Sequence, residues 1–175
     1  SGQFQDDSYT LANDELEKYN FRGNFTMSPT DDLTIQWNTG YTSQWLSGTP
    51  SGNNAEGIQL NAFRQERNYV GSADPRRIAK LLEYEFDQTN ERLNSGITLT
   101  YAPVENLTNK FVLGYDFSHQ EGQNQRNFGF FLKPMGSRTN DTFQRRVLTF
   151  DYVGTYSLAL TSDINSNFSW GGQAI

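Results

Sequence analysis

Cysteine is absent from the 175 residues and histidine occurs once. Without thiols the chain can form neither a disulfide nor a Cys/His metal site, so we expect no metal and no cofactor. Apolar runs of 18 or more residues are also missing, which excludes membrane-spanning helices. A formal charge of −6 and a pI near 4.7 disfavour nucleic acid as a partner.

Aromatic residues make up 14% of the chain, although hydrophobic residues make up only 35% and the mean hydropathy is −0.72. A disordered chain would have few aromatics. An antiparallel β protein with one face in water agrees with both values. A membrane β-barrel also agrees with them, because its lumen is polar and its loops are long.

Strict alternation of apolar and polar residues dominates the stretch from Arg92 to Phe117, with a turn at 102–106 in its middle. Side chains on a strand point to opposite faces with period two, so each half of this hairpin has one aromatic-rich face and one polar face. Each half is about ten residues long, the length that a tilted strand needs to cross a bilayer. We predict six strands of this design, at residues 19–27, 33–44, 92–101, 107–117, 145–156 and 164–174.

The predicted connections alternate in length. Those at 28–32, 102–106 and 157–163 are short, whereas those at 45–88 and 119–144 are long. In an up-and-down meander all short turns then lie at one end and all long loops at the other, as in outer-membrane barrels.

Within the connections the sequence predicts little regular structure. Residues 1–18 are polar and read as a solvated loop, and 58–63 as a short strand. Asp74 and Pro75 resemble the N-cap and first position of a short helix at about 75–85. The chain ends inside a predicted strand, so we expect a segment of a longer protein.

Alternation alone does not decide which face is inside. A soluble or surface-assembled β-sandwich would bury the apolar face, whereas a membrane barrel would turn it to lipid and enclose the polar face. Loop segregation favours the barrel, with the sandwich as the alternative. In the barrel, five polar-face residues are candidates for lining a substrate path: Arg22, Gln36, Asn38, Asn94 and Lys110.

Two strand-end motifs resemble the SusC/RagA-type TonB-dependent outer-membrane receptors. One strand ends on Tyr101-Ala102-Pro103, and the next contains Leu113-Gly114-Tyr115-Asp116. The stretches Asn38-Thr39-Gly40-Tyr41 and Trp170-Gly171-Gly172-Gln173 are similar to other strand ends of the same barrels. The resemblance covers about residues 19–175, and its weight lies in the order and spacing of these short motifs.

The resemblance implies that residues 1–175 are part of an antiparallel barrel of about 22 strands, with the plug domain absent from this chain. It implies a bacterial outer-membrane location, in contact with membrane lipid, and TonB-dependent import of oligosaccharides or peptides. It further implies a SusD-like surface lipoprotein as partner, and TonB as a partner of regions outside this chain.

Catalysis has little support in the sequence. His119 opens a predicted loop and lacks the nucleophile and orienting carboxylate of a triad, so we read it as an exposed loop residue. Scattered carboxylates such as Asp116 and Glu121 do not predict a glycosidase pair. Four loop aromatics are candidates for contact with a sugar or a lid protein, although packing within the loop explains them equally well: Trp45, Phe128, Phe130 and Phe131.

Overall fold

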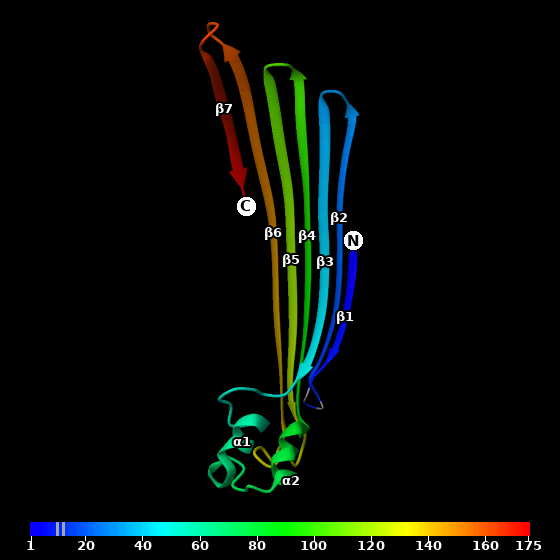
Figure 1. Ribbon diagram of the computed structural model, residues 1–175, viewed down its shortest axis with the longest axis vertical. Helices are drawn as coiled ribbons and strands as arrows, with labels where there is room; N and C mark the ends of the chain where they lie inside the picture. Colours follow the sequence, from blue (N-terminus) through cyan, green and yellow to red (C-terminus); the bar gives the residue numbers. More distant parts are fainter. Residues whose placement is uncertain (10, 12) are drawn as a thin grey trace.

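One antiparallel sheet runs through the whole molecule (Figure 1). The computed structural model describes residues 1–9, 11 and 13–175. The strands follow one another in chain order: β1 (Gly2–Ser8), β2 (Glu15–Thr30), β3 (Leu33–Gly48), β4 (Tyr84–Val104), β5 (Leu107–Arg126), β6 (Ser137–Ala159) and β7 (Asn165–Ala174). The predicted all-β up-and-down meander is therefore confirmed. β1 and β7 form the two edges, and the sheet does not close within the described chain.

The connections are segregated as the sequence predicts. Two-residue turns at 31–32 and 105–106 and a short turn at 160–164 lie at the top of Figure 1. The longer connections lie at the bottom, where 49–83 contains four short helices: α1 (Ile58–Arg64), η1 (Gln65–Arg67), α2 (Pro75–Ile78) and η2 (Ala79–Glu83). None of the helices in the described residues is both long and apolar enough to span a membrane.

The central strands are longer than the predicted ones. β4, β5 and β6 have 21, 20 and 23 residues, and much of the predicted loop at 119–144 is strand. Most residues on both faces of these extensions are polar, apart from Tyr84, Phe86 and Phe143, so sustained alternation is missing there. The extensions are strands because they pair with each other, for example Glu91 with His119 and His119 with Gln144.

Two predicted connections also differ from the structure. β1 forms within the stretch read as a loop at 1–18, because it pairs with the lower half of β2. Positions 10 and 12 of that stretch lie outside the described residues. Residues 58–64 form a helix rather than a strand, since they pack in the helical end and not in the sheet. The predicted helix after Asp74 is present, and the Asp74 carboxylate accepts from the Arg76 amide as an N-cap.

Among the described residues, none forms a second layer over the apolar face of the sheet. One row across five strands consists of Phe25, Trp37, Ile97, Leu113 and Phe150, which are 49, 42, 37, 46 and 45% exposed. Phe25 stacks on Trp37 with ring centroids 5.2 Å apart, a cross-strand contact that stabilises the pairing. A soluble sandwich made by this chain alone would bury this row under a second sheet, whereas the described residues form one sheet.

A small core closes the helical end instead. Ile78, Leu81, Tyr84 and Phe130 are buried there, with Phe131 packed against them. The two long connections thus pack together at one end of the sheet. The chain itself buries the small core but leaves the large apolar row exposed. The row therefore has to be covered by something other than these residues.

Candidate functional site

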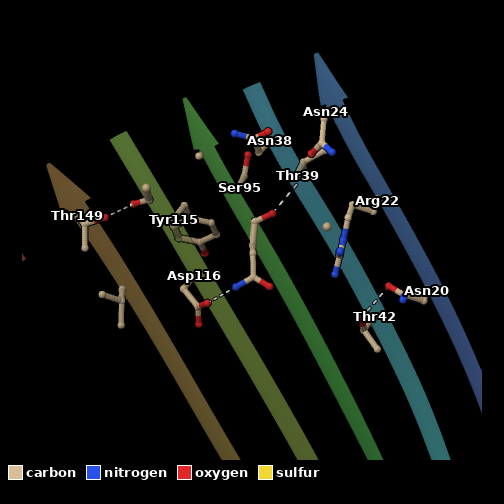
Figure 2. A pocket seen from close by; sticks show the side chains of 15 residues that line it. Asn20, Arg22, Asn24, Asn38, Thr39, Thr42, Ser95, Tyr115, Asp116 and Thr149 are labelled. Atoms are coloured by element: carbon tan, nitrogen blue, oxygen red, sulfur yellow. Dashed lines mark hydrogen bonds between the residues drawn. The ribbon is translucent and has the colours of Figure 1, made fainter. Parts of the chain in front are cut away.

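A hollow of about 430 Å³ lies on the polar face, across β2 to β6 (Figure 2). Its floor is backbone, because Gly96 and Gly114 stand opposite each other on β4 and β5, and Gly40 lies diagonally beside them on β3. A Cβ on Gly96 would meet its nearest atom only at 3.9 Å, so glycine here leaves open space above the sheet. The rim consists of polar side chains: Asn20, Arg22, Asn24, Asn38, Thr42, Asn94, Asp116 and Thr149.

The register explains why these side chains converge. Across β2 to β5, one row of paired residues runs Arg22, Gly40, Asn94 and Asp116. The row therefore has a cation at one end and an anion at the other, with Gly40 and Asn94 between them. Figure 2 shows Arg22 extending from β2 toward β3. Residues at the alternate positions, such as Tyr115, line the hollow with backbone because their side chains point to the apolar face.

Asp116 is the hydrogen-bonding centre of the rim. Arg92 Nη2 donates to Asp116 Oδ2 at 3.1 Å, and Asn94 Nδ2 donates to the same oxygen. Across the hollow, Thr42 Oγ1 donates to Asn20 Oδ1 at 3.2 Å. Most of these groups retain unused hydrogen-bonding capacity toward the hollow, since amides and carboxylates each have several donor or acceptor positions. The arrangement can bind a polar ligand without chemistry on it.

The structure brings together three of the five predicted path residues. Arg22, Asn38 and Asn94 line the hollow. Gln36 and Lys110 lie on the same face but nearer the hairpin turns, where Gln36 pairs with Thr98 and Lys110 with Thr100. Their role in a path therefore stays a prediction.

The sequence did not predict that Asp116, Asn20, Asn24 and the three glycines would form a hollow on the polar face. Asp116 was visible as a polar residue of the alternating pattern, and the Gly114-x-Asp116 spacing placed both on one face. What the pattern lacked is the register between strands, which puts Gly114 beside Gly96 and Asp116 beside Asn94. Cross-strand pairing is not encoded in the spacing within either strand.

The four predicted loop aromatics occupy different surroundings. Trp45 lies in β3 rather than in a connection, which corrects its predicted place. Phe130 is 1% exposed and is part of the small core, so the structure supports packing within the loop for this residue. Phe131 packs on the same core, with its ring centroid 5.3 Å from that of Phe130. Phe128 is 83% exposed and stays a candidate for contact with a partner.

An ion pair joins the two long connections. Arg126 Nε donates to both oxygens of Glu56 at 3.0 Å, and its guanidinium lies 4.2 Å above the Tyr84 ring centre. The hydrogen bond with Glu56 raises the pKa of Arg126 above its usual value. Both side chains are largely buried, at 13 and 15% exposure, so the pair is a structural clamp of the helical end.

His119 is not an exposed loop residue. It lies in β5, and its side chain is 21% exposed, with Nε2 3.1 Å from Glu121 Oε1. The contact is between side chains two residues apart on one face of a strand. Within residues 1–9, 11 and 13–175, no group of three or more His, Asp and Glu residues is placed to hold a metal ion.

Comparison with solved structures identifies the fold. The chain is similar to the RagAB peptide transporter, with a TM-score of 0.70 and 15% identity over 91% of this chain. The RagAB peptide importer in its "closed-closed" and "open-open" states gives TM-scores of 0.70 and 0.69, each at 14% identity. No family model and no curated protein matches the sequence.

The match concerns a part of those proteins. This chain spans about a fifth of their length, 20% in each case. The sheet is therefore an open segment of a β-barrel wall, with the same strand arrangement as the corresponding part of the transporter. These neighbours are described as a peptide transporter and a peptide importer.

Proposed function

We propose that the chain is part of the barrel wall of a SusC/RagA-type, TonB-dependent outer-membrane receptor that imports oligopeptides or oligosaccharides. The observation that carries the proposal is the pairing of an uncovered apolar face with a polar, hollowed reverse face in one sheet. Lipid would cover the first and a wet lumen would adjoin the second. The hollow then lies on the path of the substrate.

The apolar face has the height of a bilayer. On β5 the outward positions from Leu107 to Phe117 are apolar or aromatic except for Asn109, and the next outward residues are His119 and Glu121. Ten residue steps of about 3.4 Å give roughly 34 Å of strand, which a tilt of about 40° reduces to roughly 26 Å. That value is close to the roughly 25 Å apolar band of outer-membrane barrels.

The other strands place the edge of the band at the same level. Tyr41, Leu93 and Phe117 occupy one row, and the outward positions beyond that row are mostly polar or acidic. The strand extensions and the helical end then project outside the cell, and the two-residue turns face the periplasm. The exposed Phe128 lies at this outer end, where a SusD-like lipoprotein would contact the barrel.

Adjacent residues on β5 test the orientation. Leu113 points to the apolar face, whereas Val112 points to the polar face beside Thr98 and Asp151. In the intact outer-membrane protein, Leu113→Arg should cost about 2–4 kcal/mol of folding free energy, as expected for an arginine at mid-membrane. Val112→Arg should be nearly neutral.

The measurement is equilibrium unfolding in lipid vesicles, read as the gel shift between folded and unfolded barrel. If Leu113→Arg still folds and Val112→Arg loses the folded band, the apolar face does not point to lipid, and the proposed function is wrong. Transport is tested separately by uptake of labelled peptides or oligosaccharides, which should stop when TonB is deleted.

A further inference from the structure

The two faces of the sheet carry opposite net charge. On β2 to β6 the polar face has six cations, Lys18, Arg22, Arg92, Lys110, Arg126 and Arg145, and three carboxylates, Asp116, Asp141 and Asp151. The apolar-side positions of the same strands have two cations, Arg138 and Arg146, and six carboxylates, Glu15, Glu17, Glu85, Asp87, Glu91 and Glu121. Although the whole chain has a net negative charge, the polar face of the sheet therefore has a net positive charge.

Three of the six basic residues lie at the hollow or one row away from it. Arg22 lines it directly, and Arg92 donates to Asp116 on its rim. Arg92 and Arg145 are each in register with Ser118, one row away from Asp116. Asp116 is the one carboxylate among the residues that line the hollow.

Most of this positive charge is not neutralised inside the sheet. The ion pairs of the described residues are Arg92–Asp116, His119–Glu121 and Arg126–Glu56. Neither Arg22 nor Arg145 belongs to a pair, and both side chains are exposed. A guanidinium presents two parallel N–H donors that match a carboxylate, so free arginines on a polar wall favour carboxylate ligands.

We infer that the hollow binds acidic oligopeptides, with Arg22 and Arg145 supplying the attraction for Asp and Glu side chains. This inference rests on the proposed function, whose substrate it narrows. A peptide fits better than an acidic sugar, because Tyr115 is the one aromatic residue lining the hollow and its ring belongs to the other face. Asn20, Asn24 and Asn38 offer amides that can both donate to and accept from peptide bonds.

Neighbouring arginines on β6 supply a matched test. Arg145 belongs to the polar face, whereas Arg146 points to the other face, where its guanidinium lies 5.7 Å from the Phe117 ring centre. In the purified intact protein, fluorescence anisotropy would measure binding of a peptide with four glutamates and of the same peptide with four glutamines. The wild type should bind the glutamate peptide at least about ten-fold more tightly, and the difference should shrink at high salt.

Arg22→Gln and Arg145→Gln should each weaken binding of the glutamate peptide by about three- to five-fold, as expected for exposed charge pairs. Arg146→Gln should leave it unchanged. Binding of the glutamine peptide should not respond to any of the three. Thermal unfolding of Arg22→Gln should match the wild type.

Equal affinity for the two peptides would overturn the inference while leaving the transport proposal intact. So would equal effects of Arg145→Gln and Arg146→Gln. Weaker binding of both peptides with lower thermal stability would mean that the arginines pair with another part of the protein. Tighter binding of tetragalacturonate than of the glutamate peptide would show that the ligand is an acidic sugar and not a peptide. Failure of TonB-dependent uptake for every peptide and oligosaccharide would instead reject the proposed function.

Discussion

Adjacent residues in this protein have different surroundings. Val112 and Leu113, like Arg145 and Arg146, are neighbours in sequence but lie on opposite faces of a one-layer sheet. A substitution therefore reports on one face alone, and its neighbour provides the control. This property follows from the two-residue period of a strand and needs no knowledge of the partner strands.

The Glu56–Arg126 pair permits a prediction at the residue scale. Glu56→Gln should lower the free energy of opening the helical end by about 1–3 kcal/mol, because a largely buried guanidinium loses its charged partner. Hydrogen exchange of the amides at 57–83 in the intact protein measures this opening. Glu66→Gln, at an exposed position of the same segment, should change it by less than about 0.5 kcal/mol.

The Glu56–Arg126 pair also determines how the stability of the helical end depends on pH. The hydrogen bond with Glu56 raises the pKa of Arg126, and a cation with a raised pKa contributes its full stability at every pH below its unfolded pKa, which lies far above neutrality. That contribution is lost only as pH rises through the higher folded value. Opening free energies corrected for intrinsic exchange should therefore not change between about pH 7 and pH 10 on account of this pair. A steady decrease over that range would contradict the assignment of the clamp to Arg126.

At the scale of elements, the β6–β7 hairpin depends on a glycine under an aromatic ring. Gly154 pairs with Trp170, and a Cβ at Gly154 would run into the indole. Gly154→Val should displace the ring and destabilise the hairpin by about 1–3 kcal/mol, a typical cost of overpacking. Equilibrium unfolding of the intact protein in lipid vesicles measures the loss.

Gly172→Val is the control for this prediction. Gly172 lies on the same hairpin opposite Tyr152, and a Cβ there would meet no atom within 4 Å. The valine should change the unfolding free energy by no more than about 0.5 kcal/mol. Equal losses in the two variants would mean that backbone freedom, and not the Trp170 contact, decides the effect.

The sequence predicts strands correctly where one face of the strand is apolar and the other is polar. The predicted ranges at 19–27, 92–101 and 107–117 all lie within strands of the structure. The extensions beyond them, and β1, have polar residues on both faces and gave no periodic signal. Residues 58–64 gave a wrong signal, because their apolar positions pack in the helical end and not in the sheet.

For the whole molecule, the lower half of the sheet should lie outside the membrane. The chain has no cysteine, so single cysteines can report the level of each position. In cells carrying the intact protein, Glu121→Cys should react with a membrane-impermeant maleimide added outside, since it lies beyond the apolar band. Leu113→Cys should stay unlabelled, because the proposed barrel turns this position toward lipid.

The opposite end of the same strand completes the test. Asn106 lies in the two-residue turn before β5, so Asn106→Cys should react only after the outer membrane is permeabilised. Labelling of Asn106→Cys in intact cells, with Glu121→Cys protected, would show that the barrel is inserted the other way. Labelling of Leu113→Cys at the rate of Glu121→Cys would show that no lipid covers the band.

The amino-acid sequence by itself determined which residues share a face, where the tight turns lie and how the connections alternate in length, because these features depend on local periodicity and turn chemistry. It also placed Arg22, Asn38 and Asn94 on one polar face. Only the tertiary structure decided the register that sets Gly96 against Gly114 and so opens the hollow, the burial of Phe130, and the length of β4 to β6. Pairing between strands joins residues that are far apart in the chain, and the spacing within one strand carries no record of its neighbour.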